Sequence, residues 1–85
     1  MHNMVKVKLY TLSTCSHCQA AKRLLKELGI KYEFVDVDLL SPEKRRSVLK
    51  EVIALNPACS FPTIVIGEKV IVGNREAEIR GALGL

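Results

Sequence analysis

The stretch YTLSTCSHCQAAKRLLKELG, residues 10–29, contains the change of hydrophobic period that decides the fold. The preceding stretch VKVKLY (residues 5–10), which overlaps it at Tyr10, alternates apolar and polar side chains. This alternation is typical of a half-buried strand. Beyond Gln19 the apolar residues take helical spacing: Ala21, Leu24, Leu25 and Leu28. Gly29 is placed to end this helix in a left-handed cap. The motif CSHC therefore stands where a strand gives way to a helix.

The remaining elements follow from the same kind of signals. KYEFVDV (residues 31–37) predicts a second strand, and Ser41-Pro42 predicts a helix start that Asn56-Pro57 ends. We expect this helix to be lined by Val48, Leu49, Val52 and Ile53. FPTIVIGEKVIVG (residues 61–73) predicts a β-hairpin that turns at Gly67-Glu68, and residues 75–85 predict one short helix.

The predicted order is β-α-β-α-β-β-α, an α/β fold with a mixed four-stranded sheet and three flanking helices. The first two strands are joined by a helical crossover and should be parallel, whereas the last two form an antiparallel hairpin. With 85 residues and no linker or repeat, we expect residues 1–85 to form a single domain and a monomer.

Composition restricts the compartment and the partners. Three cysteines are too few, and odd in number, for a secreted disulfide scaffold, and we see neither a leader peptide nor an apolar run of membrane-spanning length. We therefore expect a cytoplasmic protein without a membrane partner. The net charge of +4 is scattered apart from EKRR (residues 43–46), which lacks interleaved aromatics. That cluster indicates a solvated helix face, and no nucleic-acid partner is predicted.

The pair Cys15 and Cys18 is the main candidate for chemistry. A helix N-terminus offers unpaired N–H groups and a partial positive charge, which favour a thiolate over a thiol at Cys15. A thiolate is the nucleophile of disulfide exchange. We expect Cys15 to attack a substrate disulfide and Cys18, on the same face of the helix, to resolve the mixed disulfide. A separate reductase would then restore the dithiol.

The two intervening residues, Ser16 and His17, should tune the redox balance. A protonated His17 would favour the Cys15 thiolate and make the disulfide more oxidising, within the range of about −270 to about −120 mV known for such motifs. The alternative is that His17 is merely an exposed, solvated side chain.

Metal binding is a weaker alternative. A closed zinc site would need Cys15, Cys18, Cys59 and a histidine, but His17 lies between two of the ligands and His2 is near the chain end. We predict no metal site. Cys59 itself has three interpretations: a third redox-active or resolving thiol, an occasional metal ligand together with the cysteine pair, or a partly buried small apolar residue.

Pro62 directly precedes a predicted strand, where it costs no needed ladder hydrogen bond and can be cis. The strand–CxxC–helix opening, the SFPT loop and the VIVG before the last helix together resemble glutaredoxins, over nearly the whole chain. The resemblance implies the minimal thioredoxin-like fold. It also implies a cis Pro62 that faces the cysteines, and a Phe61 backbone that binds the incoming thiol or peptide.

The departures from that family indicate the electron donor. Glutathione-using members have a basic residue where this chain has Leu12, and Gly-Gly plus a polar pair where it has Val72-Gly73-Asn74-Arg75. The pattern is more similar to NrdH-redoxins, which implies electrons from a flavoprotein or similar disulfide reductase, disulfide-containing protein substrates and no tightly bound cofactor. Glutathione remains the alternative, with one carboxylate held by Asn74 and the N-terminus of the last helix. Partner choice should depend on the surface around Thr14, Ser16, Phe61, Gly73 and Asn74.

Two further alternatives follow from the motif and the resemblance. Copper carriers also place C-x-x-C between a first strand and a first helix, although their order is βαββαβ. Some glutaredoxins form iron–sulfur-bridged dimers through the first cysteine and glutathione.

Overall fold

The computed structural model describes residues 5–85 and confirms the predicted order of elements. The strands are β1 Val7–Thr11, β2 Glu33–Asp36, β3 Thr63–Ile66 and β4 Lys69–Val72. The helices are α1 Ser16–Glu27, α2 Pro42–Leu55 and α3 Glu76–Ala82, with a 3₁₀ helix, η1 Val37–Leu39, between β2 and α2.

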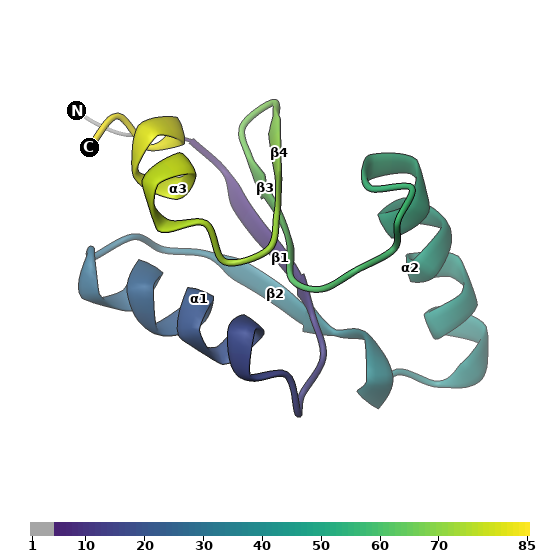
Figure 1. Cartoon of the computed structure of the whole chain (residues 1–85). Helices are drawn as coiled ribbons and strands as arrows, with labels where there is room; N and C mark the ends of the chain where they lie inside the picture. Colours follow the sequence, from purple (N-terminus) through teal and green to yellow (C-terminus); the bar gives the residue numbers. More distant parts are fainter. Residues whose placement is uncertain (1–4) are drawn as a thin grey trace.

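The four strands form one mixed sheet in the order β2-β1-β3-β4 (Figure 1). β1 pairs with β2 in parallel and with β3 antiparallel, and β3 and β4 form the predicted antiparallel hairpin. The β1–β2 register places Thr11 opposite Asp36. The carboxyl ends of these two strands therefore meet at one edge of the sheet, and the chain segments that follow them are neighbours.

Helices α1 and α3 cover one face of the sheet, and α2 lies on the other side (Figure 1). The core between the sheet and α1 and α3 is aliphatic, and Leu9, Leu25, Ile64 and Ile79 are completely buried in it. Alternation along β1 explains this: Val7 and Leu9 face the core, whereas Lys8 and Tyr10 face α2. The burial of aliphatic side chains is the main stabilising contribution of this layer.

Helix α1 ends as the glycine signal predicts. Gly29 adopts a left-handed φ of 74°. Its N–H donates to the Lys26 carbonyl at 3.0 Å, and the Ile30 N–H donates to the Leu25 carbonyl at 2.9 Å. This is the Schellman arrangement, which satisfies carbonyls that a helix end would otherwise leave unpaired.

Helix α2 begins and ends as predicted, but its packing differs from the expectation. Ser41 caps it by accepting a hydrogen bond from the Lys44 N–H at 3.4 Å, and Pro42 is its first residue. Of the four residues expected to line it, Val52 is fully buried, whereas Ile53 is 50% exposed. A hydrogen bond of 3.1 Å from the Tyr10 hydroxyl to the Glu51 carboxylate joins α2 to the sheet.

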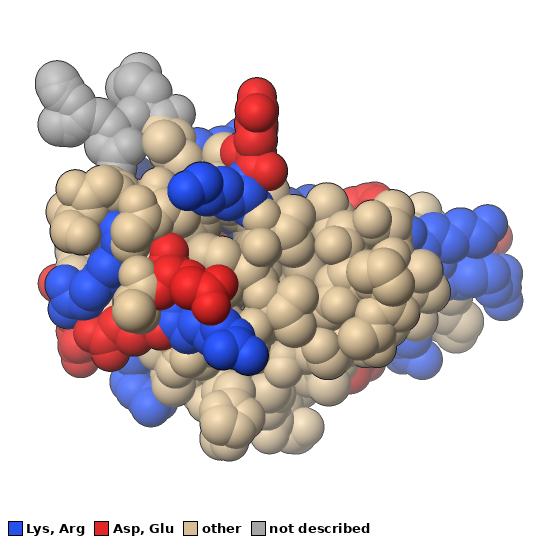
Figure 2. Space-filling model, turned by 45° about the horizontal axis from the view of Figure 1, so that its top comes forward, with Lys and Arg blue, Asp and Glu red and all other residues tan. Residues whose placement is uncertain are grey.

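Other differences are smaller. β1 begins two residues later than predicted, the second strand is shorter at both ends, and η1 was not predicted. Basic side chains gather at the end of the molecule where α2 lies (Figure 2). Helix α2 contains the exposed Lys44, Arg46 and Lys50. No helix in residues 5–85 is long and apolar enough to cross a membrane.

The two glycines near helix ends provide a stability test. Gly29→Ala forces an L side chain into a left-handed conformation and should lower the free energy of unfolding by about 1 kcal/mol. Gly81→Ala is the matched control, since Gly81 lies within α3 and its new Cβ would meet open space. It should raise the free energy of unfolding by about 0.5 kcal/mol, measured for both variants by urea denaturation. Equal effects of the two substitutions would refute the role assigned to Gly29.

Candidate active site

Cys15 is the N-cap residue of α1. It has extended backbone angles (φ −89°, ψ 118°), and its Sγ accepts a hydrogen bond from the Cys18 N–H at 3.2 Å. The sulfur thus occupies the place of the side-chain oxygen in an ordinary cap. Because negative charge is favoured at a helix N-terminus, this position stabilises a thiolate. Cys15 is also partly exposed, so an incoming disulfide can reach it.

Cys18 has the opposite environment. It lies in the first turn of α1 and is 0% exposed. Burial, together with a hydrogen bond to the Cys15 thiol, raises the pKa of Cys18 to about 12. Both cysteines are free thiols. The motif therefore presents one reachable sulfur and one protected, protonated sulfur.

A group of polar side chains joins α1 to the carboxyl ends of β1 and β2. Asp36 accepts hydrogen bonds from the Thr11 hydroxyl at 2.6 Å and from the Lys22 ammonium at 3.2 Å. The Lys22 ammonium also lies over the Phe34 ring, 3.9 Å from its centroid. The Lys22 charge acts to lower the pKa of Cys18, although less strongly than burial raises it.

The loop before β3 contains the expected cis peptide bond, between Phe61 and Pro62. Asn56 holds the loop: its side-chain amide donates to the Ser60 carbonyl at 3.3 Å and to the Thr63 hydroxyl at 3.1 Å. The Pro62 carbonyl accepts from the Gly73 N–H at 2.8 Å. The loop and the chain that leaves β4 are thereby joined.

A shallow pocket of about 350 Å³ brings several predicted residues together. It is lined by His17, Phe61, Val72, Gly73, Asn74 and Arg75. It therefore spans the start of α1, the proline loop and the chain leading to α3. The buried Oδ1 of Asn74 accepts no hydrogen bond from residues 5–85.

Other predicted residues lie outside this pocket. Thr14 and Ser16 are exposed on either side of Cys15, and Pro62 is buried. Cys59 is partly buried with a φ of 51°. Within the described part of the chain, no three His, Cys, Asp or Glu side chains are grouped to hold a metal ion. His2, which was considered as a zinc ligand, lies outside the described residues.

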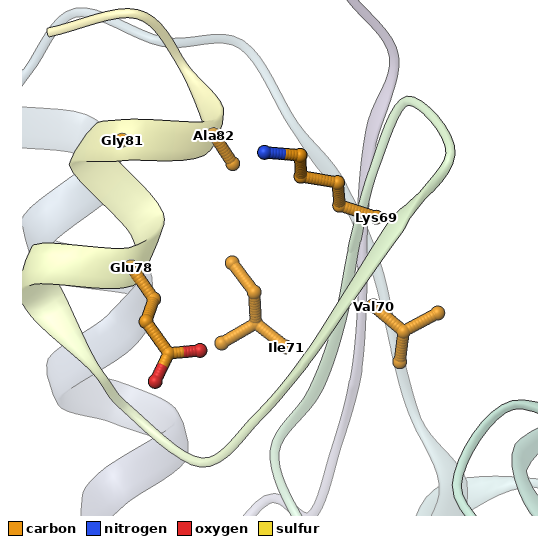
Figure 3. A pocket seen from close by; sticks show the side chains of 6 residues that line it. All are labelled: Lys69, Val70, Ile71, Glu78, Gly81 and Ala82. Atoms are coloured by element: carbon orange, nitrogen blue, oxygen red, sulfur yellow. The ribbon is translucent and has the colours of Figure 1, made fainter.

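A second hollow, of about 390 Å³, lies away from the cysteines between β4 and α3 (Figure 3). Its floor is Ile71, and Lys69 and Glu78 extend from the strand and the helix on either side. None of the predicted site residues lines it. No cysteine lines it, and it is not part of the candidate active site.

The predictions missed four polar residues near the cysteines. Arg75 lines the pocket, Lys22 interacts with Cys18 and pairs with Asp36, and Asp38 binds the loop before Cys15. A signal for the two aspartates was available in the sequence. Asp36 lies near the end of the second predicted strand and Asp38 follows it, where the carboxyl end of a parallel strand should meet that of its neighbour.

Comparisons with known proteins agree with this geometry. A family model described as Glutaredoxin matches residues 7–71. No curated protein matches the chain. Among solved structures, methanoredoxin from Methanosarcina acetivorans is 47% identical with a TM-score of 0.90, over 94% of this chain and 85% of that one.

Two further structures are similar over the same share of this chain, 94%. The glutaredoxin of Methanosarcina mazei Go1 is 46% identical with a TM-score of 0.87, over 79% of its own length. The glutaredoxin of Archaeoglobus fulgidus is 32% identical with a TM-score of 0.87, over 87% of its own length. The chain belongs to the glutaredoxin family, and with its Cys15–Cys18 pair it is a thiol-disulfide oxidoreductase.

Proposed function

We propose that this protein reduces disulfides in other proteins, with Cys15 as the attacking thiolate and Cys18 as the resolving thiol. Electrons would come from a thioredoxin-type disulfide reductase. The observation that carries the assignment of the two cysteines is their contrast in environment. The Cys15 sulfur caps α1 and can be reached, whereas the Cys18 sulfur is buried and has a raised pKa.

In the first step the Cys15 thiolate attacks one sulfur of the substrate disulfide. A new disulfide bond forms between Cys15 and that sulfur, and the other substrate sulfur leaves as a thiolate. In the second step Cys18 loses its proton and attacks the Cys15 sulfur. The substrate leaves with both of its sulfurs reduced, and the two electrons have come from the Cys15–Cys18 dithiol, which is now a disulfide.

The raised pKa of Cys18 also determines at which step of the reaction this thiol can attack. Part of the increase comes from the hydrogen bond and the charge interaction with Cys15. Once Cys15 is bound in a mixed disulfide, both contributions disappear while the Lys22 cation stays nearby. The pKa of Cys18 should therefore fall at the step in which Cys18 must attack. Before that step the thiol is protonated and protected from unwanted oxidation.

The choice of electron donor rests on the anion-binding groups of the pocket. Glutathione has two carboxylates, which need charged or polar donors. Leu12 supplies none, and the Nε of Arg75 is already engaged by the Val72 carbonyl at 3.3 Å and by Glu78 at 3.7 Å. These features favour a protein reductase over glutathione. A dithiol of this kind works in a reducing compartment, and we propose the cytoplasm.

Glutathione remains a second candidate because of Arg75. This cation and Asn74 line the same pocket as His17, close to the start of α1. A carboxylate could displace the exposed, weak contact of Arg75 with Glu78. The sequence pattern had indicated Asn74 and the N-terminus of the last helix as the carboxylate partners, without Arg75.

The assignment of the two thiols predicts different alkylation rates. A thiol with a pKa of about 12 is ionised to roughly one part in ten thousand at pH 8, so Cys15 should react with iodoacetamide at least about 100-fold faster than Cys18. Cys15→Ser and Cys18→Ser variants, each also carrying Cys59→Ser, would report the two thiols separately. In guanidinium the two rates should converge. A Cys18 that is equally reactive in the folded protein would contradict the assignment.

The two substitutions should also separate the two steps. Cys18→Ser leaves the attacking thiolate but removes the resolving thiol, so we expect it to accumulate a mixed disulfide with a protein substrate, visible by non-reducing electrophoresis. Cys15→Ser should form none and lose reductase activity. Cys59→Ser is the control and should retain turnover. Trapping through Cys18 in the Cys15→Ser variant would reverse the proposed roles.

The electron donor is tested by a comparison of reductants. The oxidised protein would receive NADPH with thioredoxin reductase, or NADPH with glutathione reductase and glutathione, and a protein disulfide as acceptor. We expect turnover with the first system. Turnover with the second alone would refute the proposed donor and favour glutathione. In that case Arg75→Ala should raise the KM for glutathione.

A further inference from the structure

Asp38, in η1, binds the loop that leads to Cys15 through two hydrogen bonds to one residue. The Ser13 N–H donates to Asp38 Oδ1 at 2.8 Å, and the Ser13 hydroxyl donates to Asp38 Oδ2 at 2.5 Å. Both carboxylate oxygens are thus used, although the residue lies at the surface. These hydrogen bonds lower the pKa of the Asp38 carboxyl, so the group stays ionised at neutral pH.

Ser13 is held from a second direction as well. Its carbonyl accepts a hydrogen bond of 3.0 Å from the Gln19 side-chain amide, which extends back from α1. Ser13 lies inside the turn that the Cys15 N–H closes by donating to the Leu12 carbonyl at 3.2 Å. Hydrogen bonds to the N–H, the hydroxyl and the carbonyl of Ser13 therefore hold the turn that precedes Cys15.

The parallel strands explain why Asp38 can reach Ser13. Thr11 and Asp36 are opposite each other in the β1–β2 register, and Ser13 and Asp38 lie two residues beyond them. The Arg45 guanidinium holds the Asp38 segment in turn, since it donates to the carbonyls of Asp38 at 3.2 Å and Leu40 at 3.0 Å. The contact thus connects α2, η1 and the turn before α1.

We propose that Asp38 is a positioning residue for Cys15: by holding Ser13 it keeps the cysteine in the N-cap geometry where its sulfur meets the Cys18 N–H. This inference rests on the proposed role of Cys15 as the nucleophile. Cys15 caps α1 in an extended backbone conformation, and the preceding turn holds the chain in that conformation. A looser turn leaves the sulfur at the helix N-terminus for less of the time, and the thiolate loses stabilisation.

Geometry rather than charge must carry this effect. The negative charge of a carboxylate by itself disfavours a nearby thiolate. Asp38→Asn removes the charge, but its amide oxygen can still accept from the Ser13 N–H while its amide nitrogen donates to the Ser13 hydroxyl. Asp38→Ala removes both the charge and the two hydrogen bonds. The two variants therefore separate positioning from electrostatics.

The test measures Cys15 alkylation by iodoacetamide between pH 4 and 10, in a protein carrying Cys18→Ser and Cys59→Ser. For Asp38→Ala we expect the midpoint of the pH profile to rise and the rate at pH 7 to fall about fivefold, the size expected for one lost net hydrogen bond. Asp38→Asn should retain the parent rate or exceed it. Glu68→Ala removes an equally exposed carboxylate from the hairpin turn and should change nothing.

A second readout is the reduction potential of the Cys15–Cys18 pair, measured in the Cys59→Ser protein. A destabilised thiolate makes the dithiol more reducing, so Asp38→Ala should lower the reduction potential by about 20 mV. This value corresponds to a fivefold change in the equilibrium constant, because a tenfold change shifts the potential of a two-electron couple by about 30 mV. Circular dichroism would check folding. If Asp38→Ala does not fold, Ser13→Ala takes its place, since it removes the hydroxyl bond alone and should give a smaller slowing.

The outcomes distinguish this inference from the proposed function. If Asp38→Ala matches Glu68→Ala in rate and potential, or if Asp38→Asn is as slow as Asp38→Ala, Asp38 does not act by positioning. An unchanged rate in Ser13→Ala, where that variant carries the test, would also overturn the inference. If Cys15 of the parent protein reacts no faster than free cysteine, the proposed nucleophile itself is wrong.

Discussion

The parallel pairing of β1 with β2 is the constraint on which the active site depends. β1 is the strand that joins the two halves of the sheet, with β2 on one side and the β3–β4 hairpin on the other. Because parallel strands run in the same direction, β1 and β2 end at the same edge of the sheet. The turn before Cys15 and the η1 segment with Asp38 consequently emerge side by side. The position of the reactive sulfur is set by the sheet, although the sulfur belongs to a helix.

The four-residue motif CSHC (residues 15–18) contains two thiols in very different environments. Cys15 is the residue before the first turn of α1, where its sulfur can take the cap position and remain partly exposed. Cys18 comes three residues later, which turns its side chain inward to full burial. Desolvation then opposes ionisation at Cys18, while the Cys15 sulfur accepts a hydrogen bond at the helix end. The spacing of the motif therefore places one thiol where it is partly exposed and the other where it is buried.

The sequence predicted features that depend on neighbouring residues. The helix start at Ser41-Pro42, the cap at Gly29 and the turn at Gly67-Glu68 were all confirmed. The cis bond before Pro62, which the resemblance to glutaredoxins implied, is also present. The expected burial along α2 was wrong for Ile53. Helical spacing shows which apolar side chains lie on the same face of the helix. How many of them are buried depends on how the helix packs against the sheet. The η1 turn was missed because three residues give too short a pattern to detect.

The sequence by itself determined the order of elements, the ends of the helices and the place of Cys15 at a helix start, since these follow from residues within a few positions of one another. The tertiary structure alone decided which distant residues surround the cysteines. Asp38 meets Ser13 across 25 positions, and Arg75 shares a pocket with His17. Such contacts depend on strand register and on the path of the chain between strands. Both result from packing the whole core, which no local pattern encodes.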